Sequence, residues 1–482
     1  SIGNDNNHSD VNAADGISVK LSALHPRYEF SQHQRVIDEL LPSVLALAVE
    51  AKKFNIGLTI DAEEAARLDI ELDVFEGLAF APELAGWDGL GFVLQAYQKR
   101  ALSVVDWLVE LAKSSERKLK VRLVKGAYWD AEIKHAQEMG VAEFPVFTRK
   151  AHTDLSYQVC AGKLLDNRDV IYPQFATHNA YTVALIMQMA GTDTSTFEFQ
   201  RLHGMGDLLY RQIRESTGAV WPLRVYAPVG VHRDLLPYLV RRLLENGANG
   251  SFINQFLDED VAAADLVQNV ESTISKAQGK RNTQIPLALD IFNAFGEKRD
   301  NSRGIDLDDP LAFDIVSQKV SEFAPEKWRA GPIINGEMRT DNAHGCYSPA
   351  DTSKLIGHCS HATAEDVAAA MNSAADAYPD WQATTCEQRA LILDAVADLL
   401  EAQTEELTTL ISFEGGRTLN DGISEVREAV DFCRYYALQI RYLTSDSPTQ
   451  VKLAQGQGVF VCISPWNFPL AIFVGQVVAA LV

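Results

Sequence analysis

The chain has 482 residues, of which 47% are hydrophobic and 22% are charged, so it is a globular protein long enough for two or three domains. Its formal net charge of −22 leaves no basic excess to neutralise phosphates, which argues against a general nucleic-acid surface. The six cysteines lack metal-ligand spacing, which predicts free thiols in a reducing compartment. No apolar run reaches the roughly 18 residues of a membrane span, and residues 1–15 lack the apolar core of a signal peptide.

From Gly16 onward, short runs rich in β-branched residues alternate with longer helical patterns. The predicted strands are Ile17–Leu21, Gly57–Ile60, Gly91–Leu94, Lys120–Val124, Val170–Phe175, Thr196–Leu202 and Leu223–Ala227. The helices between them include Gln34–Phe54, Gln98–Ser115, Phe147–Leu165 and Ala180–Ala190. This alternation indicates a parallel sheet, either doubly wound or closed as a (βα)8 barrel, although seven strands are one short of that barrel.

Polar or aromatic residues lie at the end of each predicted strand. They are Lys20, Asp61, Gln95, Arg122 with Lys125, Thr177 with His178, Gln200 with His203, and Tyr226. In a barrel these residues would converge at the carboxyl face, where barrel enzymes keep their chemistry, whereas a doubly wound sheet would concentrate them at one switch point. Contributions from seven strands favour the barrel, and the absence of a GxGxxG turn after the first strand counts against a classical dinucleotide fold.

Residues Asp234–Gly247 predict a helix that starts at an aspartate N-cap and stops at a glycine. Tyr238, Arg241, Arg242 and Glu245 share one face of it. Two adjacent arginines beside a tyrosine could clamp a small carboxylate by bidentate hydrogen bonds. Taken alone, a charged stripe of this kind is more often a solvated surface, but polar strand ends that gather at one rim favour the binding interpretation.

Three further segments carry candidate chemistry, each with a structural alternative. The turn Lys125–Trp129 suits an anion or an electron-rich ring, or is an ordinary turn with surface charges. Thr177 and His178 place a hydroxyl and an imidazole before a helix N-terminus, a natural phosphate position; the structural alternative is that Thr177 or Asn179 caps the helix. Glu63 and Glu64 are better explained as first-turn residues that stabilise a helix, whereas Asp61 at a strand end is a candidate functional residue.

The second half of the chain has a different character. Predicted helices cover Ala364–Tyr378, Cys386–Glu401, Thr404–Gly415 and Gly422–Leu443, and Gly458–Ser464 predicts a strand that leads into a Pro-Trp-Asn-Phe-Pro turn. The apolar residues 470–482 end without a cap, which predicts a cut end. The predicted organisation is a polar lead-in (residues 1–16), a barrel (17–257), a helical linker (258–330) and a second α/β domain (331–482).

Residues from Gly16 to Phe256 closely resemble the proline dehydrogenase barrel of the bifunctional proline utilization A family. The motifs that carry the resemblance are Ile17–Ser22, Asp61–Glu64, Gln95–Arg100, Arg122–Trp129, Phe175–Asn179 and Tyr238–Arg242. From Gly331 onward the chain resembles the start of an aldehyde dehydrogenase module, carried by Ser464–Pro469. The resemblance implies a (βα)8 proline dehydrogenase-type barrel that lacks its first strand, followed by the N-terminal part of an aldehyde dehydrogenase-like α/β domain, in a fragment truncated at both ends.

The resemblance implies FAD-dependent oxidation of L-proline to Δ1-pyrroline-5-carboxylate, within the catabolism of proline to glutamate. It assigns the substrate pocket to Lys20, Asp61, Tyr128, Leu202, Tyr226, Tyr238, Arg241 and Arg242. It places Gln95 and Arg122 against the isoalloxazine ring, and Lys125, Gly126, Ala127, Trp129, Thr177, His178, Gln200 and Glu245 along the rest of FAD. No metal site is expected.

A second, NAD-dependent activity of the family oxidises glutamate semialdehyde to glutamate. Asn467 matches the oxyanion-stabilising asparagine of that module. The family's catalytic nucleophile is a cysteine, and no cysteine follows Asn467, so we expect this activity to be incomplete in this chain. The resemblance further implies membrane quinone as electron acceptor, a cytoplasmic protein that is peripheral at the inner face of the membrane, a homo-oligomer at full length, and no bound nucleic acid.

Three alternatives stay open. A related flavin-barrel reductase is disfavoured by the Tyr-x-x-Arg-Arg pattern, and a DNA-binding repressor would need a basic N-terminal module that residues 1–15 do not supply. The third alternative is a non-catalytic fragment. Bleaching of a flavin spectrum by L-proline would distinguish the enzyme from such a fragment.

Overall fold

The computed structural model describes residues 8–218, 220–231, 233, 235, 236, 238–240, 270–446 and 456–482. The chain divides into two compact units. The barrel unit comprises residues 1–133 and 144–285, and the second unit comprises residues 134–143 and 286–482. Within the described ranges, no helix is both long and apolar enough to cross a membrane.

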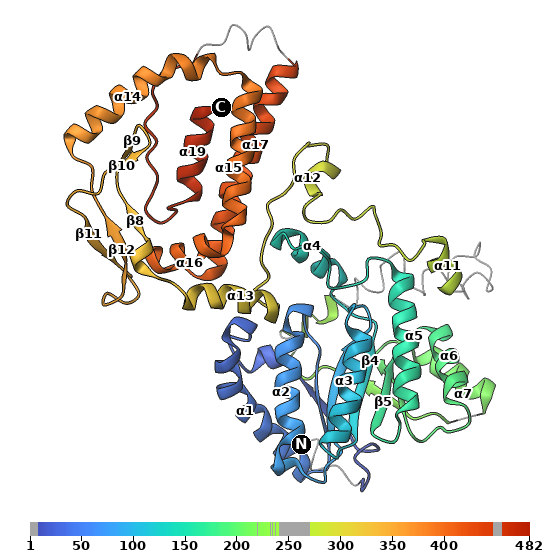
Figure 1. Cartoon of the computed structure of the whole chain (residues 1–482). Coiled ribbons are helices and arrows are strands. Elements are labelled where there is room, and N and C mark those ends of the chain that lie inside the picture. Colours follow the sequence, from blue (N-terminus) through green and yellow to red (C-terminus); the bar gives the residue numbers. More distant parts are fainter. Residues whose placement is uncertain are drawn as a thin grey trace. The chain divides into compact units, whose positions relative to one another are not determined.

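The barrel unit is built on one parallel sheet whose seven strands pair in chain order (Figure 1). The strands are β1 (Gly16–Val19), β2 (Gly57–Ile60), β3 (Leu90–Gln95), β4 (Leu119–Val124), β5 (Ile171–Ala176), β6 (Glu198–Leu202) and β7 (Leu223–Tyr226). All seven predicted strands are present, and the predicted class of a parallel, barrel-type sheet is confirmed.

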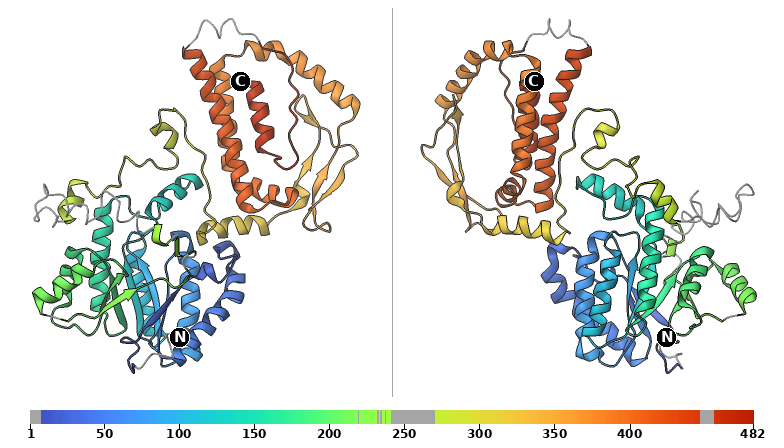
Figure 2. Two further views of the ribbon diagram at one scale, coloured as in Figure 1. Left: turned by 180° about the vertical axis from the view of Figure 1, so that it is seen from behind. Right: turned by 45° about the vertical axis from the view of Figure 1, so that its right-hand side comes forward.

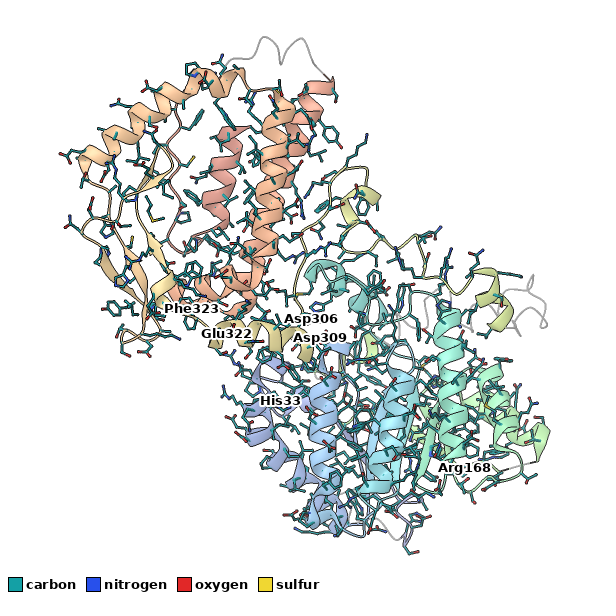
Figure 3. The ribbon with its side chains drawn as sticks, in the orientation of Figure 1. His33, Arg168, Asp306, Asp309, Glu322 and Phe323 are labelled. Carbon is teal, nitrogen blue, oxygen red and sulfur yellow. The ribbon has the colours of Figure 1, made fainter. Side chains whose placement is uncertain are left out.

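Helices follow the strands and cover the outer face of the sheet (Figures 1 and 2). They are α1 (His33–Lys53), α2 (Leu68–Phe80), α3 (Ala101–Ser114), α4 (Trp129–Met139), α5 (Lys150–Asp166), α6 (Ala180–Ala190), α7 (Asp207–Thr217) and α11 (Val270–Lys276), with short 3-10 turns η2 (Leu21–Ala23), η3 (Phe30–Gln32), η4 (Ala65–Arg67) and η5 (Pro82–Leu84). In α1, Val36, Leu40 and Val44 recur every fourth residue and are fully buried in the main core. His33 (labelled in Figure 3) ties α1 to α2, because its Nε2 lies 2.7 Å from Asp73 Oδ2.

The sheet curls so strongly that its two edges approach each other. Arg224 on β7 donates hydrogen bonds to the carbonyl oxygens of Ala14 and Asn12, both at 2.7 Å, just before β1. From β4, the Lys120 ammonium donates to the carbonyl oxygen of Val11 at 2.8 Å. The segment before β1 therefore lies against the side chains of the inner face, as in a barrel that is partly closed.

The second unit contains short strands and long helices. Its strands are β8 (Arg329–Ala330), β9 (Ile333–Ile334), β10 (Glu337–Met338), β11 (His344–Tyr347) and β12 (Leu355–Cys359). Its helices are α12 (Ile291–Ala294), α13 (Pro310–Ser321), η6 (Pro325–Lys327), α14 (Ala364–Ala383), α15 (Cys386–Ala402), α16 (Thr404–Gly415), α17 (Leu419–Asp446) and α19 (Ala471–Leu481). Helices α15, α17 and α19 share a small apolar core that includes Leu393, Val430 and Val478 (orange to red in Figure 2). The four predicted helices are present.

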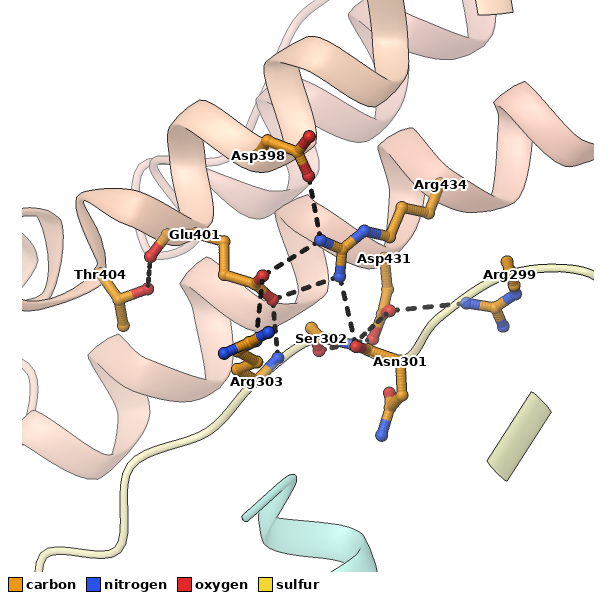
Figure 4. A network of polar contacts seen from close by, with 9 residues as sticks. All are labelled: Arg299, Asn301, Ser302, Arg303, Asp398, Glu401, Thr404, Asp431 and Arg434. Carbon is orange, nitrogen blue, oxygen red and sulfur yellow. Dashed lines mark hydrogen bonds and ion pairs between the residues drawn. The ribbon is translucent and has the colours of Figure 1, made fainter. Parts of the chain in front are cut away.

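A polar network holds the chain before α13 against α15 and α17 (Figure 4). Arg434 on α17 lies 3.1 Å from the carboxylate of Glu401 and 3.3 Å from that of Asp398. Asp431, also on α17, accepts hydrogen bonds from the Ser302 main-chain nitrogen at 3.1 Å and from its hydroxyl at 2.8 Å. The same largely buried pair holds the segment, because Arg434 donates to the Asn301 carbonyl at 3.2 Å and Glu401 accepts from the Arg303 main-chain nitrogen at 2.8 Å.

Two sequence predictions need comment. Gly458–Ser464 is not a strand, because it pairs with no strand of the described chain, and Val461 and Ile463 are 70% and 79% exposed. A run of β-branched residues favours extended backbone, but a strand also needs a hydrogen-bonded neighbour.

Of the predicted helix Asp234–Gly247, residues 235, 236 and 238–240 are helical, whereas Arg241, Arg242 and Glu245 lie outside the described residues.

Candidate active site

Arg122 on β4 is the centre of the candidate site. Its guanidinium donates to Gln200 Oε1 on β6 at 2.6 Å, to Asp61 Oδ1 after β2 at 3.1 Å, and to the Ser18 hydroxyl on β1 at 2.9 Å. The side chain is only 10% exposed, so these bonds form away from bulk water. One buried cation on β4 thus joins side chains on or just after three other strands at the inner face of the sheet.

Tyr226 at the end of β7 completes this set. Its hydroxyl donates to Asp61 Oδ2 at 3.2 Å, and its ring centre lies 5.2 Å from the Arg122 guanidinium carbon. Burial raises the pKa of Tyr226 to about 12, and the negative charge of Asp61 adds to this effect. The phenol is therefore neutral near pH 7 and remains a hydrogen-bond donor.

Lys20, which follows β1, supplies a second cation. Its ammonium donates to the Ala62 carbonyl at 3.2 Å and to the Tyr128 hydroxyl at 3.3 Å. Burial lowers the pKa of Lys20, but attraction from Asp61, Tyr128 and Glu63 outweighs burial and leaves the pKa raised. Lys20 therefore stays charged and is suited to hold an anion such as a carboxylate.

Gln95 at the end of β3 carries a buried oxygen with unused bonding capacity. The side-chain nitrogen donates to the Glu63 carbonyl at 2.8 Å, whereas Oε1 is buried and finds no donor among the described residues. Leaving such an acceptor unpaired costs about 1–3 kcal/mol, so this oxygen fits a ligand that presents an N–H group. The ring of a flavin has such a group.

The turn after β4 brings the backbone unusually close to a neighbouring ring. Gly126 has φ +128°, and a Cβ atom there would lie 2.4 Å from the ring of Tyr97. Only glycine fits this position. Beside it, the Lys125 ammonium lies 2.5 Å from Asp154 Oδ1, and burial lowers the pKa of Lys125 despite that carboxylate. Ala127 is exposed, and the Trp129 indole nitrogen donates to a main-chain carbonyl at 2.8 Å.

The segment after β5 begins α6. Asn179 is the N-cap and accepts from the main-chain nitrogen of Thr182 at 3.0 Å, while the Thr177 hydroxyl accepts from the nitrogen of Asn179 at 3.1 Å. His178 Nε2 accepts from the main-chain nitrogen of Leu202 at 3.0 Å, which corresponds to a neutral imidazole with its proton on Nδ1. Helix capping thus explains the Asn179 side chain and one contact of Thr177.

Two further predicted site residues are described, one near Tyr226 and one in the second unit. Tyr238 is described, and its phenol is close enough to raise the pKa of Tyr226. Asn467 belongs to the second unit and is exposed; its main-chain oxygen accepts from Arg417. No group of three or more potential metal ligands occurs in the described part of the chain.

Glu63 differs from its predicted role. It is buried, accepts from the Ser22 main-chain nitrogen at 2.9 Å, and also bonds the Ser22 hydroxyl, so it is not a solvated first-turn residue. Glu64, in contrast, precedes η4 and pairs with Arg67 at 3.1 Å on the surface. The contact between Glu63 and Ser22 joins residues 41 positions apart, which local helix signals do not report.

Two further acidic residues were not singled out from the sequence. Glu132 accepts from the Ala65 nitrogen at 2.8 Å and from the Tyr97 hydroxyl at 3.2 Å. It therefore supports the segments that follow β2 and β3 beside the site. Glu198 lies under Gln200 on β6. Strand alternation was a usable signal for Glu198, because it shares a side-chain face with Gln200.

Comparison with known proteins agrees with this geometry. Residues 1–255 match the family described as proline dehydrogenase, and residues 337–482 match the aldehyde dehydrogenase family. The chain belongs to the proline dehydrogenase family. The family resemblance inferred from the motifs is thereby confirmed.

Relatives of this family align with the whole chain. It is 47% identical over 494 residues to the bifunctional protein PutA of Escherichia coli K12, an alignment that covers 100% of this chain and 37% of that protein. A crystal structure of a bifunctional proline utilization A protein is 45% identical with a TM-score of 0.86, and covers 100% of this chain and 46% of that one. The 1-pyrroline-5-carboxylate dehydrogenase of Staphylococcus epidermidis is 32% identical over 158 residues, 31% of each chain. The chain thus spans less than half the length of the PutA proteins it matches.

Proposed function

We propose that the barrel unit binds FAD and oxidises L-proline to Δ1-pyrroline-5-carboxylate, in the catabolism of proline to glutamate. The observation that carries the proposal is the buried set in which Arg122 joins Asp61 and Gln200, with Tyr226 on the same carboxylate. These groups stand on different strands of a barrel-type sheet in a chain of the proline dehydrogenase family. Strand ends that converge in this way are typical of barrel active sites.

The residues present fit FAD. The unpaired oxygen of Gln95 and the cation of Arg122 suit the polar edge of an isoalloxazine ring. The remainder of FAD would be held by Lys125, Ala127, Trp129, Thr177, His178, Gln200 and Glu245. When bound, the flavin supplies the acceptor for the hydride that leaves the substrate.

The protein's own contribution is to orient the substrate. We assign the carboxylate of proline to Lys20, whose raised pKa keeps it cationic, together with Arg241 and Arg242. The walls of the pocket are assigned to Asp61, Tyr128, Leu202, Tyr226 and Tyr238. Fixing one end of a small substrate places its reacting carbon in a defined position, and such orientation accounts for a large part of enzymatic rate.

Anaerobic titration of the purified chain with L-proline tests the proposal. We expect bound flavin whose visible absorbance is bleached by L-proline. A preparation without flavin, or a flavin that L-proline does not bleach, would contradict it. Arg242→Met should weaken proline binding without loss of flavin, while the matched variant Arg214→Met, at an exposed position of α7, should bind proline like the parent chain.

For the full-length protein we propose a second, NAD-dependent oxidation of glutamate semialdehyde, with Asn467 as its oxyanion-stabilising residue. The match of residues 337–482 to the aldehyde dehydrogenase family supports this. We further propose membrane quinone as electron acceptor, a peripheral position at the inner face of the cytoplasmic membrane, and a homo-oligomer. Quinone reduction by membrane vesicles in the presence of L-proline tests the first of these.

A further inference from the structure

A buried carboxylate lies one layer below the candidate site. Glu198 is 3% exposed and precedes Gln200 by two residues on β6, so both side chains point to the same face of the sheet. Glu198 Oε1 accepts from Gln200 Nε2 at 2.6 Å and from Gln174 Nε2 at 2.8 Å. The same carboxylate holds Arg224 by two bonds of 2.8 and 3.0 Å.

This arrangement fixes which way the amide of Gln200 faces. A glutamine amide has a donating and an accepting end of nearly equal shape, so its orientation is set by its neighbours. Glu198 as a carboxylate can only accept, so Gln200 must turn its nitrogen toward it. The oxygen of Gln200 then faces Arg122, which can only donate, and accepts from Arg122 Nε at 2.6 Å.

We propose that Glu198 is a positioning residue for the candidate active site: it orients the Gln200 amide and thereby holds the Arg122 guanidinium in its place beside the flavin. The inference rests on the proposed function for the flavin, but the hydrogen-bond relay belongs to the chain itself. Arg224, a further partner of Glu198, contacts Asn12 and Ala14 before β1 and serves the closure of the sheet. Orientation of Gln200 is a separate role of the same carboxylate, whose Oε1 accepts from both Gln200 Nε2 and Arg224 Nε.

Two variants separate the direction of the hydrogen bonds from the charge. In Glu198→Gln, the new amide can donate to the oxygen of Gln200, so Gln200 is free to turn its nitrogen toward Arg122, where two donors would oppose each other. In the double variant Glu198→Gln with Gln200→Glu, the carboxylate at 200 accepts from both Arg122 and residue 198. The bond between positions 198 and 200 is reversed in this double variant, but Arg122 again faces an atom that can only accept, and the oxygen at 198 can still accept from Arg224.

The first readout needs no flavin. In arginine-labelled protein, the Nε–H signal of Arg122, assigned by its loss in Arg122→Lys, should exchange with water roughly tenfold or more faster in Glu198→Gln, and at the parental rate in the double variant. Parental exchange in the single variant overturns the proposal. If the single variant does not fold, the double variant decides: it must fold and exchange like the parent, and unfolding or fast exchange would overturn the proposal.

The second readout is the midpoint potential of bound flavin. Removal of a negative charge alone would raise the potential, because reduced flavin gains negative charge. Misplacement of the Arg122 cation lowers the potential, and we expect this effect to dominate, so the midpoint potential should be lower in Glu198→Gln than in the parent chain. A raised potential in the single variant contradicts the positioning role. A parent chain that binds no flavin would contradict the proposed function instead, and the exchange measurement would still test the relay.

Discussion

Gly126→Ala is the most direct test of the backbone geometry next to the candidate cofactor site. At φ +128° an alanine occupies a region that L side chains rarely adopt, which costs about 1–3 kcal/mol. Its Cβ would also lie 2.4–2.6 Å from three ring carbons of Tyr97. This ring is 2% exposed, and its hydroxyl is held by Glu132 at 3.2 Å, so it cannot move aside without loss of that bond. Overpacking adds about 1–3 kcal/mol.

The sum predicts that Gly126→Ala lowers the free energy of unfolding by about 2–6 kcal/mol, a large part of the roughly 5–15 kcal/mol that is usual for a domain. Urea unfolding followed by circular dichroism measures this, and flavin content reports the local effect. Gly162→Ala is the matched control: it lies in α5 with nothing within 4 Å of an added Cβ, so it should stabilise by up to about 1 kcal/mol. Equal stability of the Gly126→Ala and parent chains would refute the reasoning.

Other predictions concern the second unit. Arg434→Met should lower its free energy of unfolding by about 2–4 kcal/mol, because it leaves the largely buried carboxylate of Glu401 without its main partner; Arg303→Met, 70% exposed, should cost less than about 1 kcal/mol. Burial raises the pKa of Glu401, but bonds from Arg434 and Arg303 outweigh it and lower the pKa. The contribution of the Glu401 carboxylate to the free energy of unfolding is therefore complete above the unfolded pKa of about 4.3 and is lost as pH falls through the folded pKa. Acid titrations of the parent and of Arg434→Met should show a smaller pH dependence of stability in the variant. Since no cysteine follows Asn467, the purified chain should not reduce NAD with glutamate semialdehyde; NADH formation would contradict this.

The spacing of hydrophobic residues along the sequence and the composition of each segment were sufficient to predict the sheet of the barrel unit. Each strand is a short β-branched run that ends at a polar residue, and the helices between strands carry apolar residues at helical spacing, as in α1. Parallel order follows from this alternation, so the strand ends had to meet at one face. That inference brought Asp61, Arg122 and Tyr226 together before any contact was known, and the structure joins them by hydrogen bonds.

The features that were missed depend on partners distant in the sequence. Whether Glu63 is a surface or a buried residue is decided by Ser22, and nothing local distinguishes it from Glu64. The same limit explains the wrong strand at Gly458–Ser464, since its residues favour extended backbone but the described chain offers no neighbouring strand. The roles of Arg241 and Arg242 stay predictions, because they lie outside the described residues.

The buried polar side chains on the inner face of the sheet are better explained by the hydrogen-bond directions that they impose than by any stability that they add to the fold. Desolvation makes a buried ion pair a poor source of net stability, and well-packed apolar residues often replace one without loss. Yet the inner face carries two such pairs in successive layers, Arg224 with Glu198 and Arg122 with Asp61, linked through Gln200. An apolar replacement of the lower pair could preserve the sheet but would leave the Gln200 amide free to turn. The charge of Glu198 therefore has its clearest use in the direction it imposes on the hydrogen bonds above it.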